Sequence, residues 1–196
     1  MCGIVGIYLK NSKYELSLGS FLADMLNSME GRGPDSAGFA IYSKEIKNYY
    51  KYWICLNKLS ENDFGLRAKE YFDNHKIYKH SDHVVLETTE EPKKVLTILG
   101  EHFAEFSIVG YGKSINIFKQ TGNPKDVVKN FQLSSFSGSH GIGHTRMATE
   151  SLVTTEGSHP YSTAEDECLV HNGLSLIHIS EPTRRRGISY AVFCLK

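Results

Sequence analysis

The sequence predicts an α+β domain, because short apolar runs of strand length alternate with helix-periodic stretches along most of the chain. Three observations favour this class. An apolar, β-rich run begins directly behind the N-terminus, an amphipathic stretch follows it, and two apolar runs of strand length occur late in the chain. The chain has 196 residues, of which 40% are hydrophobic and 22% charged, and this suits one globular domain with a continuous core.

The N-terminal part is predicted to form a strand and then a helix. A strand over Gly3–Leu9 would hold the N-terminus inside a sheet and keep it from fraying. Apolar residues then follow three-and-four spacing, and this helix ends near Gly31 and Gly33. The periodic positions are Leu18, Phe21, Leu22, Met25, Leu26 and Met29, and the methionines are expected in the core.

The middle of the chain is predicted to alternate between strands and helices. Strands are expected at Gly38–Tyr42 and Tyr49–Leu56, and a polar helix within Ser60–Lys79. Residues 82–118 are expected to form a compact α/β layer, with strand His83–Thr88, helix Lys93–His102, and a strand pair around Phe106–Tyr111 and Ser114–Phe118.

The last predicted elements are a helix and two core strands. The helix runs from Pro124 to Phe131, with Asn123 as its N-cap before a first-turn proline. The strands are Gly138–Arg146 and Glu167–His171, and the polar segment Thr149–Asp166 between them is expected to be a loop.

Charge and composition favour a small-molecule partner. The numbers of basic and acidic residues are equal, which argues against nucleic acid or an anionic membrane as the main partner. No apolar run reaches the roughly 18 residues that a membrane span needs, and the N-terminus lacks a cationic signal-peptide start, so we expect a cytoplasmic protein.

The cysteines and histidines do not predict a metal site. Cys2, Cys55, Cys168 and Cys194 are widely spaced, which favours free thiols over disulfides, and Cys55 and Cys168 are expected to be small buried residues. Three histidines, His140, His144 and His159, have no acidic or cysteine partners at metal-ligand spacing, so we expect them to form walls of a site.

The C-terminal segment differs in character from the rest of the chain. From Leu174 it reads LSLIHISEPTR, RRG and ISYAVFCLK. The first and last of these peptides resemble the in-frame translation of a sequencing-library adapter, with RRG in the place of a sample index. We therefore expect residues 1–173 to be an incomplete native domain and residues 174–196 to be a non-native tail.

Cys2 is a candidate nucleophile. If Met1 is removed, this one residue carries both a thiol and a free α-amine. An α-amine titrates at about 7.7–8.0 and a thiol near 8.5, so the amine can accept the thiol proton without a histidine partner. Such a residue is suited to attack on an amide, although cysteine at the second position is weak evidence when taken alone.

Two glycine-containing segments strengthen this interpretation. The segment Gly31–Gly38, GRGPDSAG, has the composition of a tight turn that carries the charged residues Arg32 and Asp35. The segment Gly141–Ser151, GIGHTRMATES, ends a strand and places Arg146 where a planar guanidinium can bind a substrate carboxylate through two hydrogen bonds.

Two later motifs add polar groups. SHPY at Ser158–Tyr161 supplies His159 before a turn that the proline fixes. HNG at His171–Gly173 supplies an amide side chain next to a glycine amide, and two such donors can form an oxyanion hole.

Taken together, MCGIVG, GRGPDSAG, GHTRMAT, HPY and HNG resemble the class II glutamine amidotransferases in order and rough spacing. The resemblance implies that Cys2 is the nucleophile, that Arg146 binds the glutamine α-carboxylate, and that Asn172 with the Gly173 amide holds the oxyanion. It also implies that Arg32 and Thr145 support the site and that His159 lines it. An acidic residue that the family uses for the α-amino group has no counterpart after Gly173.

The family resemblance also implies a fold, a reaction and a partner. The fold would be the four-layer α/β/β/α sandwich of N-terminal-nucleophile hydrolases, here C-terminally truncated. The reaction would hydrolyse L-glutamine to glutamate and ammonia without a cofactor or metal, and the ammonia would pass to a synthase domain or subunit. GHTRMATES followed by VTTEGSHPY is most similar to the glutamate synthase-like branch, in particular the amidotransferase subunit of N-methylglutamate synthase-like systems.

Two other functions stay open at this point. One is another N-terminal-cysteine amide hydrolase, although Arg146 together with HNG favours glutamine. The other is a non-catalytic subunit that senses glutamine or packs against a synthase.

Overall fold

The computed structural model describes residues 2–57, 59–148, 152–172 and 190–194, the last range by its backbone only. Its helices are α1 (Leu18–Ser28), α2 (Glu61–Tyr71), α3 (Pro92–His102) and α4 (Pro124–Asn130), with short 3-10 helices at Ser12–Ser17, Glu30–Arg32 and Leu133–Ser135. Its strands are β1 (Gly3–Tyr8), β2 (Ser36–Tyr42), β3 (Tyr50–Cys55), β4 (His75–His80), β5 (His83–Thr88), β6 (Ser107–Gly112), β7 (Ile115–Thr121), β8 (His140–Arg146), β9 (Tyr161–Ala164), β10 (Glu167–Asn172) and β11 (Tyr190–Cys194). The predicted α+β class is confirmed.

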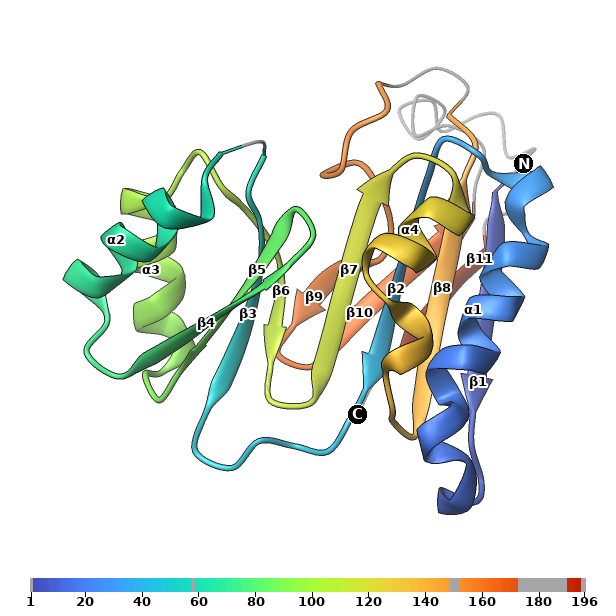
Figure 1. Ribbon diagram of the computed structural model, residues 1–196, viewed down its shortest axis with the longest axis horizontal. Coiled ribbons are helices and arrows are strands. Elements are labelled where there is room, and N and C mark those ends of the chain that lie inside the picture. The colour runs from blue at the N-terminus through green and yellow to red at the C-terminus, as the bar shows by residue number, and fades with distance from the viewer. Residues whose placement is uncertain (1, 58, 149–151, 173–189, 195–196) are drawn as a thin grey trace, which may run out of the picture.

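The described strands form three sheets, and their ladders are antiparallel. The central sheet has the order β1-β8-β2-β7, a second has β11-β10-β9, and a third has β4-β5-β3-β6 (Figure 1). β9 contacts β6, so the second and third sheets meet there. No helix in the described part of the chain is both long and apolar enough to cross a membrane.

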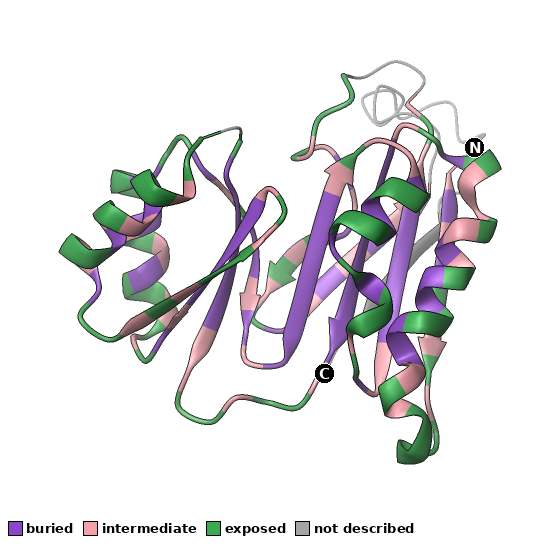
Figure 2. Cartoon of the chain, in the orientation of Figure 1, coloured by how far each residue is buried: buried purple, intermediate pink, exposed green. Residues whose placement is uncertain are grey.

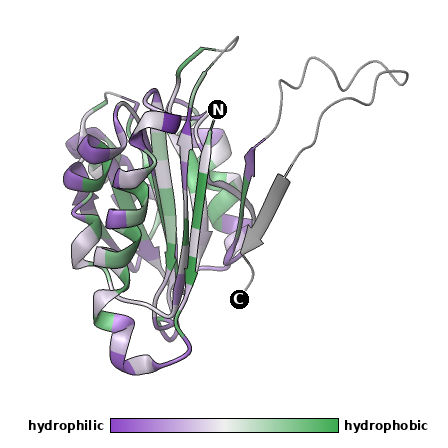
Figure 3. Ribbon diagram, turned by 90° about the vertical axis from the view of Figure 1, so that its right-hand side faces the viewer, coloured by the Kyte–Doolittle hydropathy of each residue, from purple (hydrophilic) through white to green (hydrophobic). Residues whose placement is uncertain are grey.

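The central sheet is covered on both faces. α1 and α4 lie over one face and the β11-β10-β9 sheet over the other, as the side view in Figure 3 shows. β2, β7 and β8 of this sheet are mostly buried, whereas β1 has both buried and exposed residues and the helices expose their outer sides (Figure 2). The buried core joins α1, α4 and the central sheet to Cys168 and Val170 of β10. This helix–sheet–sheet order is consistent with a sandwich.

The third sheet protects the open edge of the central sheet. Trp53 on β3 donates a hydrogen bond from Nε1 to the carbonyl oxygen of Ile115 on β7, at 3.0 Å, and its ring packs edge-on against Phe118. The opposite face of the third sheet packs against α2 and α3 in a separate apolar cluster. Since an uncovered edge strand can pair with other chains, this arrangement protects β7 from such pairing.

Most predicted elements are confirmed, but three were wrong. A helix was predicted within Ser60–Lys79, but the helix α2 ends at Tyr71. Residues 75–80 form the strand β4 instead, because they pair with β5. The predicted loop Thr149–Asp166 contains the short strand β9, which pairs with β10. The expected strand pair β6 and β7 is divided between two sheets, since β6 pairs with β3 and β7 with β2.

Two helical glycines give a matched test of packing. A Cβ added at Gly19 in α1 would lie under 3.0 Å from the carbonyl oxygens of Leu133 and Phe136, whereas one at Gly100 in α3 would meet nothing within 4 Å. We expect Gly100→Ala to stabilise the protein by up to about 1 kcal/mol and Gly19→Ala to destabilise it by about 1–3 kcal/mol. Urea unfolding of both variants measures whether the free energy of unfolding rises or falls. Stabilisation by Gly19→Ala would contradict the close packing of α1 against Leu133 and Phe136.

Candidate active site

Cys2 lies at the entrance to β1, directly before the first residue of the central sheet. Gly3 pairs with Thr145 on β8, and the half-buried Cys2 thiol points toward the carbonyl oxygen of Met147, with Sγ 3.9 Å from it. A side chain at Gly3 would meet the Thr145 hydroxyl at 2.8 Å, so only glycine allows this approach. The cysteine is thereby held where β8 leaves the sheet.

The turn GRGPDSAG fixes the same end of β8. Gly33 lies so close to the backbone of Thr145 and Arg146 that an added Cβ would lie under 3.0 Å from it. Asp35 receives a hydrogen bond from the amide of Ala148 at Oδ2, at 2.7 Å, and its own amide donates to the carbonyl oxygen of Arg146 at 3.1 Å. The turn therefore positions the residues on either side of Arg146 and Met147.

Arg146 is the last residue of β8 and is half-buried. Its Nη1 donates a hydrogen bond to the carbonyl oxygen of Gly157, at 2.9 Å, which directs the guanidinium toward the segment that precedes His159. Gly3, the neighbour of Cys2, pairs with Thr145, the neighbour of Arg146, so the cysteine and the arginine lie at the same end of the β1–β8 ladder.

Asn172 reaches the site from the second sheet. It is the last residue of β10, and its Nδ2 donates a hydrogen bond to the carbonyl oxygen of Cys2, at 3.1 Å. This bond joins the facing ends of two sheets. The structure thus brings Cys2, Arg146 and Asn172 to one end of the sandwich, while Gly173 lies outside the described residues.

The other predicted site residues have different positions. Thr145 is fully buried, and its hydroxyl donates to the carbonyl oxygen of Met29 at 3.3 Å, so it supports the backbone beneath Cys2. Arg32 is exposed, and its side chain has no hydrogen bond or ion pair within the described part of the chain. The structure does not place Arg32 against the other candidate residues.

Comparison with known proteins adds independent information on the family. No family model matches the chain. It is 43% identical over 196 residues to the glutamine amidotransferase-like protein GlxB of Rhizobium meliloti (strain 1021), an alignment that covers 97% of this chain and 65% of GlxB. It is also 36% identical over 83 residues to a glutamine–fructose-6-phosphate aminotransferase (isomerizing) of Fusobacterium nucleatum, covering 39% of this chain and 13% of that protein. These likenesses support a glutamine amidotransferase domain. The chain spans just under two thirds of the length of GlxB.

Two histidines form a neutral wall of the candidate site. The rings of His144 and His159 are stacked with centroids 4.2 Å apart, and His144 Nε2 lies 3.0 Å from the carbonyl oxygen of His171. Burial lowers the pKa of His144 to about 4 and, together with the charge of His144, the pKa of His159 to about 3. Both rings are therefore uncharged at neutral pH. His140, which was expected in the same wall, lies at the opposite end of β8, stacked on Tyr42.

This histidine pair predicts that acid destabilises the folded protein. Because the folded pKa of each ring lies below the ordinary value of 6.5, the unfolded chain binds protons that the folded chain does not. The stabilisation is complete above pH 6.5 and is lost as the pH falls toward 4, by about 1.4 kcal/mol per pH unit for each proton. Urea unfolding from pH 7 to 4.5 measures this slope. We expect His159→Gln to reduce the slope and a change at the exposed His102 to leave it unchanged.

Lys119 was not anticipated as part of the site. It lies on β7, is 6% exposed, and donates from Nζ to the carbonyl oxygens of Glu156 and Ser158, at 3.1 and 3.0 Å. Burial lowers its pKa to about 8. Lys119 anchors the segment that carries Gly157 and His159. The sequence signal was a charged residue directly after the strand-like run Ile115–Phe118.

Proposed function

We propose that this chain is the glutaminase part of a class II glutamine amidotransferase, with Cys2 as the nucleophile. The observation that carries this proposal is the hydrogen bond from Asn172 to the carbonyl oxygen of Cys2, which brings an amide donor to this residue while Arg146 lies at the same end of the sheets. A nucleophile, an oxyanion donor and a carboxylate-binding cation are the three groups that hydrolysis of glutamine requires.

The proposed mechanism has two halves. After Met1 is removed, the Cys2 α-amine takes the thiol proton and the sulfur attacks the side-chain amide carbon of L-glutamine. The Asn172 amide, with the Gly173 amide as the second donor, stabilises the negative oxygen of the tetrahedral intermediate. Ammonia leaves with the proton from the α-ammonium, and water then hydrolyses the γ-glutamyl thioester to glutamate.

The neutral histidines fit this chemistry. A positive charge on His144 or His159 would add to the charge of Arg146 and would disfavour protonation of the nearby α-amine. Since both rings are uncharged at neutral pH, the site leaves the amine free to act as the base. Arg146 then supplies the cation for the glutamine α-carboxylate.

The proposal extends to the protein as a whole. We propose that the ammonia passes to a synthase domain or subunit, as in the glutamate synthase-like branch and N-methylglutamate synthase-like systems, and that the reaction takes place in the cytoplasm. Residues 1–173 would form the amidotransferase domain and residues 174–196 the non-native tail. Arg32 would contribute to the site only if its exposed side chain turned inward.

Covalent trapping tests the proposed function. The protein is treated with diazo-oxo-norleucine, an electrophile that mimics glutamine, and its intact mass is compared with that of Cys2→Ala. We expect one adduct on protein that lacks Met1, and no adduct on the variant. A version in which residues 174–196 are replaced by the C-terminal part of GlxB serves as a second sample. No adduct on either unmutated version would refute the glutaminase proposal, and an adduct on Cys2→Ala would refute the role of Cys2.

A further inference from the structure

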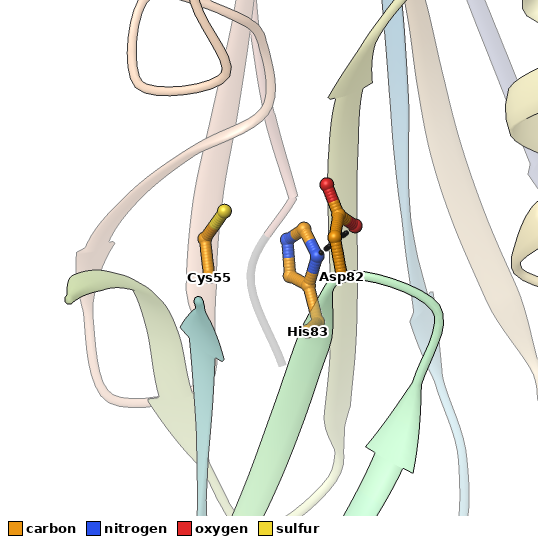
Figure 4. Close-up of side chains that lie close together, drawn as sticks. All are labelled: Cys55, Asp82 and His83. Atoms are coloured by element: carbon orange, nitrogen blue, oxygen red, sulfur yellow. Dashed lines mark hydrogen bonds and ion pairs between the residues drawn. The ribbon is translucent and has the colours of Figure 1, made fainter. Parts of the chain in front are cut away.

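A second cysteine lies in a setting that the proposed glutaminase does not use. Cys55 on β3 is directly opposite His83 on β5 in the antiparallel ladder, so both side chains stand on the inner face of the third sheet. Cys55 is 2% exposed and His83 is fully buried. Figure 4 shows the thiol and the imidazole side by side, with Asp82 on the far side of the ring.

Asp82 fixes the orientation of the His83 ring. His83 Nδ1 donates a hydrogen bond to Asp82 Oδ1 at 2.8 Å. Burial opposes ionisation of Asp82, but the hydrogen bond and the charge of His83 lower its pKa below the ordinary value. The proton of a neutral His83 therefore resides on Nδ1, and Nε2 keeps a lone pair.

The Nε2 atom of His83 is available to the thiol. It is buried and has no hydrogen-bond partner within the described residues. Figure 4 shows it on the side of the ring that faces Cys55. The Cys55 sulfur, a ring nitrogen of His83 and a carboxylate oxygen of Asp82 all lie within 4.8 Å of one another. A lone pair that is buried without a partner is costly, and the Cys55 thiol is a donor on this side of the ring.

Cys55 also faces empty space. It lines a cavity of about 300 Å³ whose wall includes Lys119, Ser107, Tyr161 and Ser162. The Lys119 ammonium adds a positive charge to this wall, and such a charge stabilises a thiolate during reaction. The other buried thiol with a described environment, Cys168, is 0% exposed and lies against the Tyr42 hydroxyl, with Oη 3.5 Å from Sγ.

A metal ion explains these residues less well. The Asp82 carboxylate binds the Nδ1 side of the His83 ring, away from Cys55 (Figure 4), so the groups that face one another are one sulfur and one nitrogen. Protein zinc sites use at least three protein ligands, and the nearby Lys119 ammonium disfavours a second cation.

We propose that Cys55 is a modification site for low-molecular-weight disulfides, with His83 as the base and Asp82 as the residue that positions it. His83 Nε2 removes the thiol proton, and the Cys55 sulfur attacks one sulfur of the small disulfide. A bond between Cys55 and that sulfur forms as the original S–S bond breaks, and the leaving thiolate takes the proton from His83. Cys55 is thereby oxidised, and half of the small disulfide is reduced to a thiol.

The neutral state of the thiol explains why a base is needed. Burial raises the pKa of Cys55, so the sulfur holds its proton at neutral pH. The proposed site does not depend on the glutaminase reaction, because neither Cys2 nor Asn172 takes part in it.

The test measures the rate at which Cys55 reacts and asks whether Asp82→Asn lowers or raises this rate. In a Cys2→Ala background, the protein is exposed to 2-hydroxyethyl disulfide at pH 7.5, and adducts are assigned by peptide mass mapping over time. We expect Cys55 to react at least tenfold faster than Cys168. Asp82→Asn should slow the reaction of Cys55 at least tenfold, because the asparagine amide donates to Nδ1 and moves the ring proton to Nε2.

Any of the following three results would overturn the proposal. If Asp82 only stabilises the start of β5, then Asp82→Asn loosens the strand and speeds the labelling of Cys55. If the buried thiols react only after the protein unfolds, Cys55 and Cys168 react at similar rates in the Cys2→Ala protein. This comparison does not depend on any substitution at Asp82. Stoichiometric binding of Zn²⁺ that Cys55→Ser abolishes would replace the modification site by a metal site.

Discussion

Replacing Cys2 by serine is expected to lower kcat for glutamine hydrolysis by at least about a thousandfold, because a hydroxyl is a far weaker nucleophile than a thiol at neutral pH. The change keeps the α-amine and removes only the sulfur. The Cys2 side chain is half-buried and its one described bond is a long contact to the carbonyl oxygen of Met147, so the fold should tolerate the change. Glutamate release is measured by an enzyme-coupled assay, and glutamine binding by calorimetry.

The contrast between turnover and binding is the informative part of this experiment. We expect the serine variant to bind glutamine within a few fold of the unmutated protein, because the proposed ligand of the α-carboxylate is Arg146 and not Cys2. Cys55→Ser is the matched control, since it removes another thiol, on β3 of the third sheet, that takes no part in the proposed glutaminase reaction. Unchanged turnover in the Cys2 variant, or an equal loss in the Cys55 variant, would contradict the assignment of the nucleophile.

Replacing Asn172 by alanine is expected to lower kcat by about a hundredfold to a thousandfold, with a much smaller effect on KM. The amide donates to the carbonyl oxygen of Cys2 in the structure, and from this position it can turn to the oxygen on which charge develops. Loss of one such donor removes stabilisation that exists only in the transition state, so turnover falls and substrate binding is kept.

A structural role for Asn172 would give a different pattern. If the side chain only ties the two sheets together, Asn172→Ala should lower the midpoint of urea unfolding, raise KM and reduce labelling of Cys2 by diazo-oxo-norleucine. Asn172→Asp is the matched comparison, because it keeps the shape and replaces the donor by a negative charge. Activity of the aspartate variant close to that of the unmutated protein would rule out an oxyanion role.

Local sequence patterns predicted the elements that pack in the usual way. The helix over Leu18–Ser28 has the expected apolar spacing, and Asn123 caps α4 by accepting from the amide of Lys125 at 2.9 Å. The strand β4 was missed because its alternation is weak and its residues are polar. Its conformation comes from pairing with β5, which no short-range pattern reports.

The candidate site could be predicted only in part for a similar reason. Motifs identified Cys2, Arg146 and Asn172 one by one, but their convergence depends on which strands pair, and that information is not local. Lys119 was missed because its partners are the carbonyl oxygens of Glu156 and Ser158, groups that every residue has. Arg32 was expected near the site because of its motif, yet the neighbouring Gly33 is the residue that makes the close contact.

The bond between Asn172 and Cys2 has a consequence for partly folded states. Because it connects the ends of two separately hydrogen-bonded sheets, the candidate site exists only while those sheets are docked. A compact acid state that keeps its strands but loses fixed packing would separate the thiol from its amide donor. Labelling of Cys2 by a glutamine mimic therefore reports docking of the two sheets, and on acidification it should disappear together with the near-ultraviolet circular dichroism, before the far-ultraviolet signal of the strands is lost.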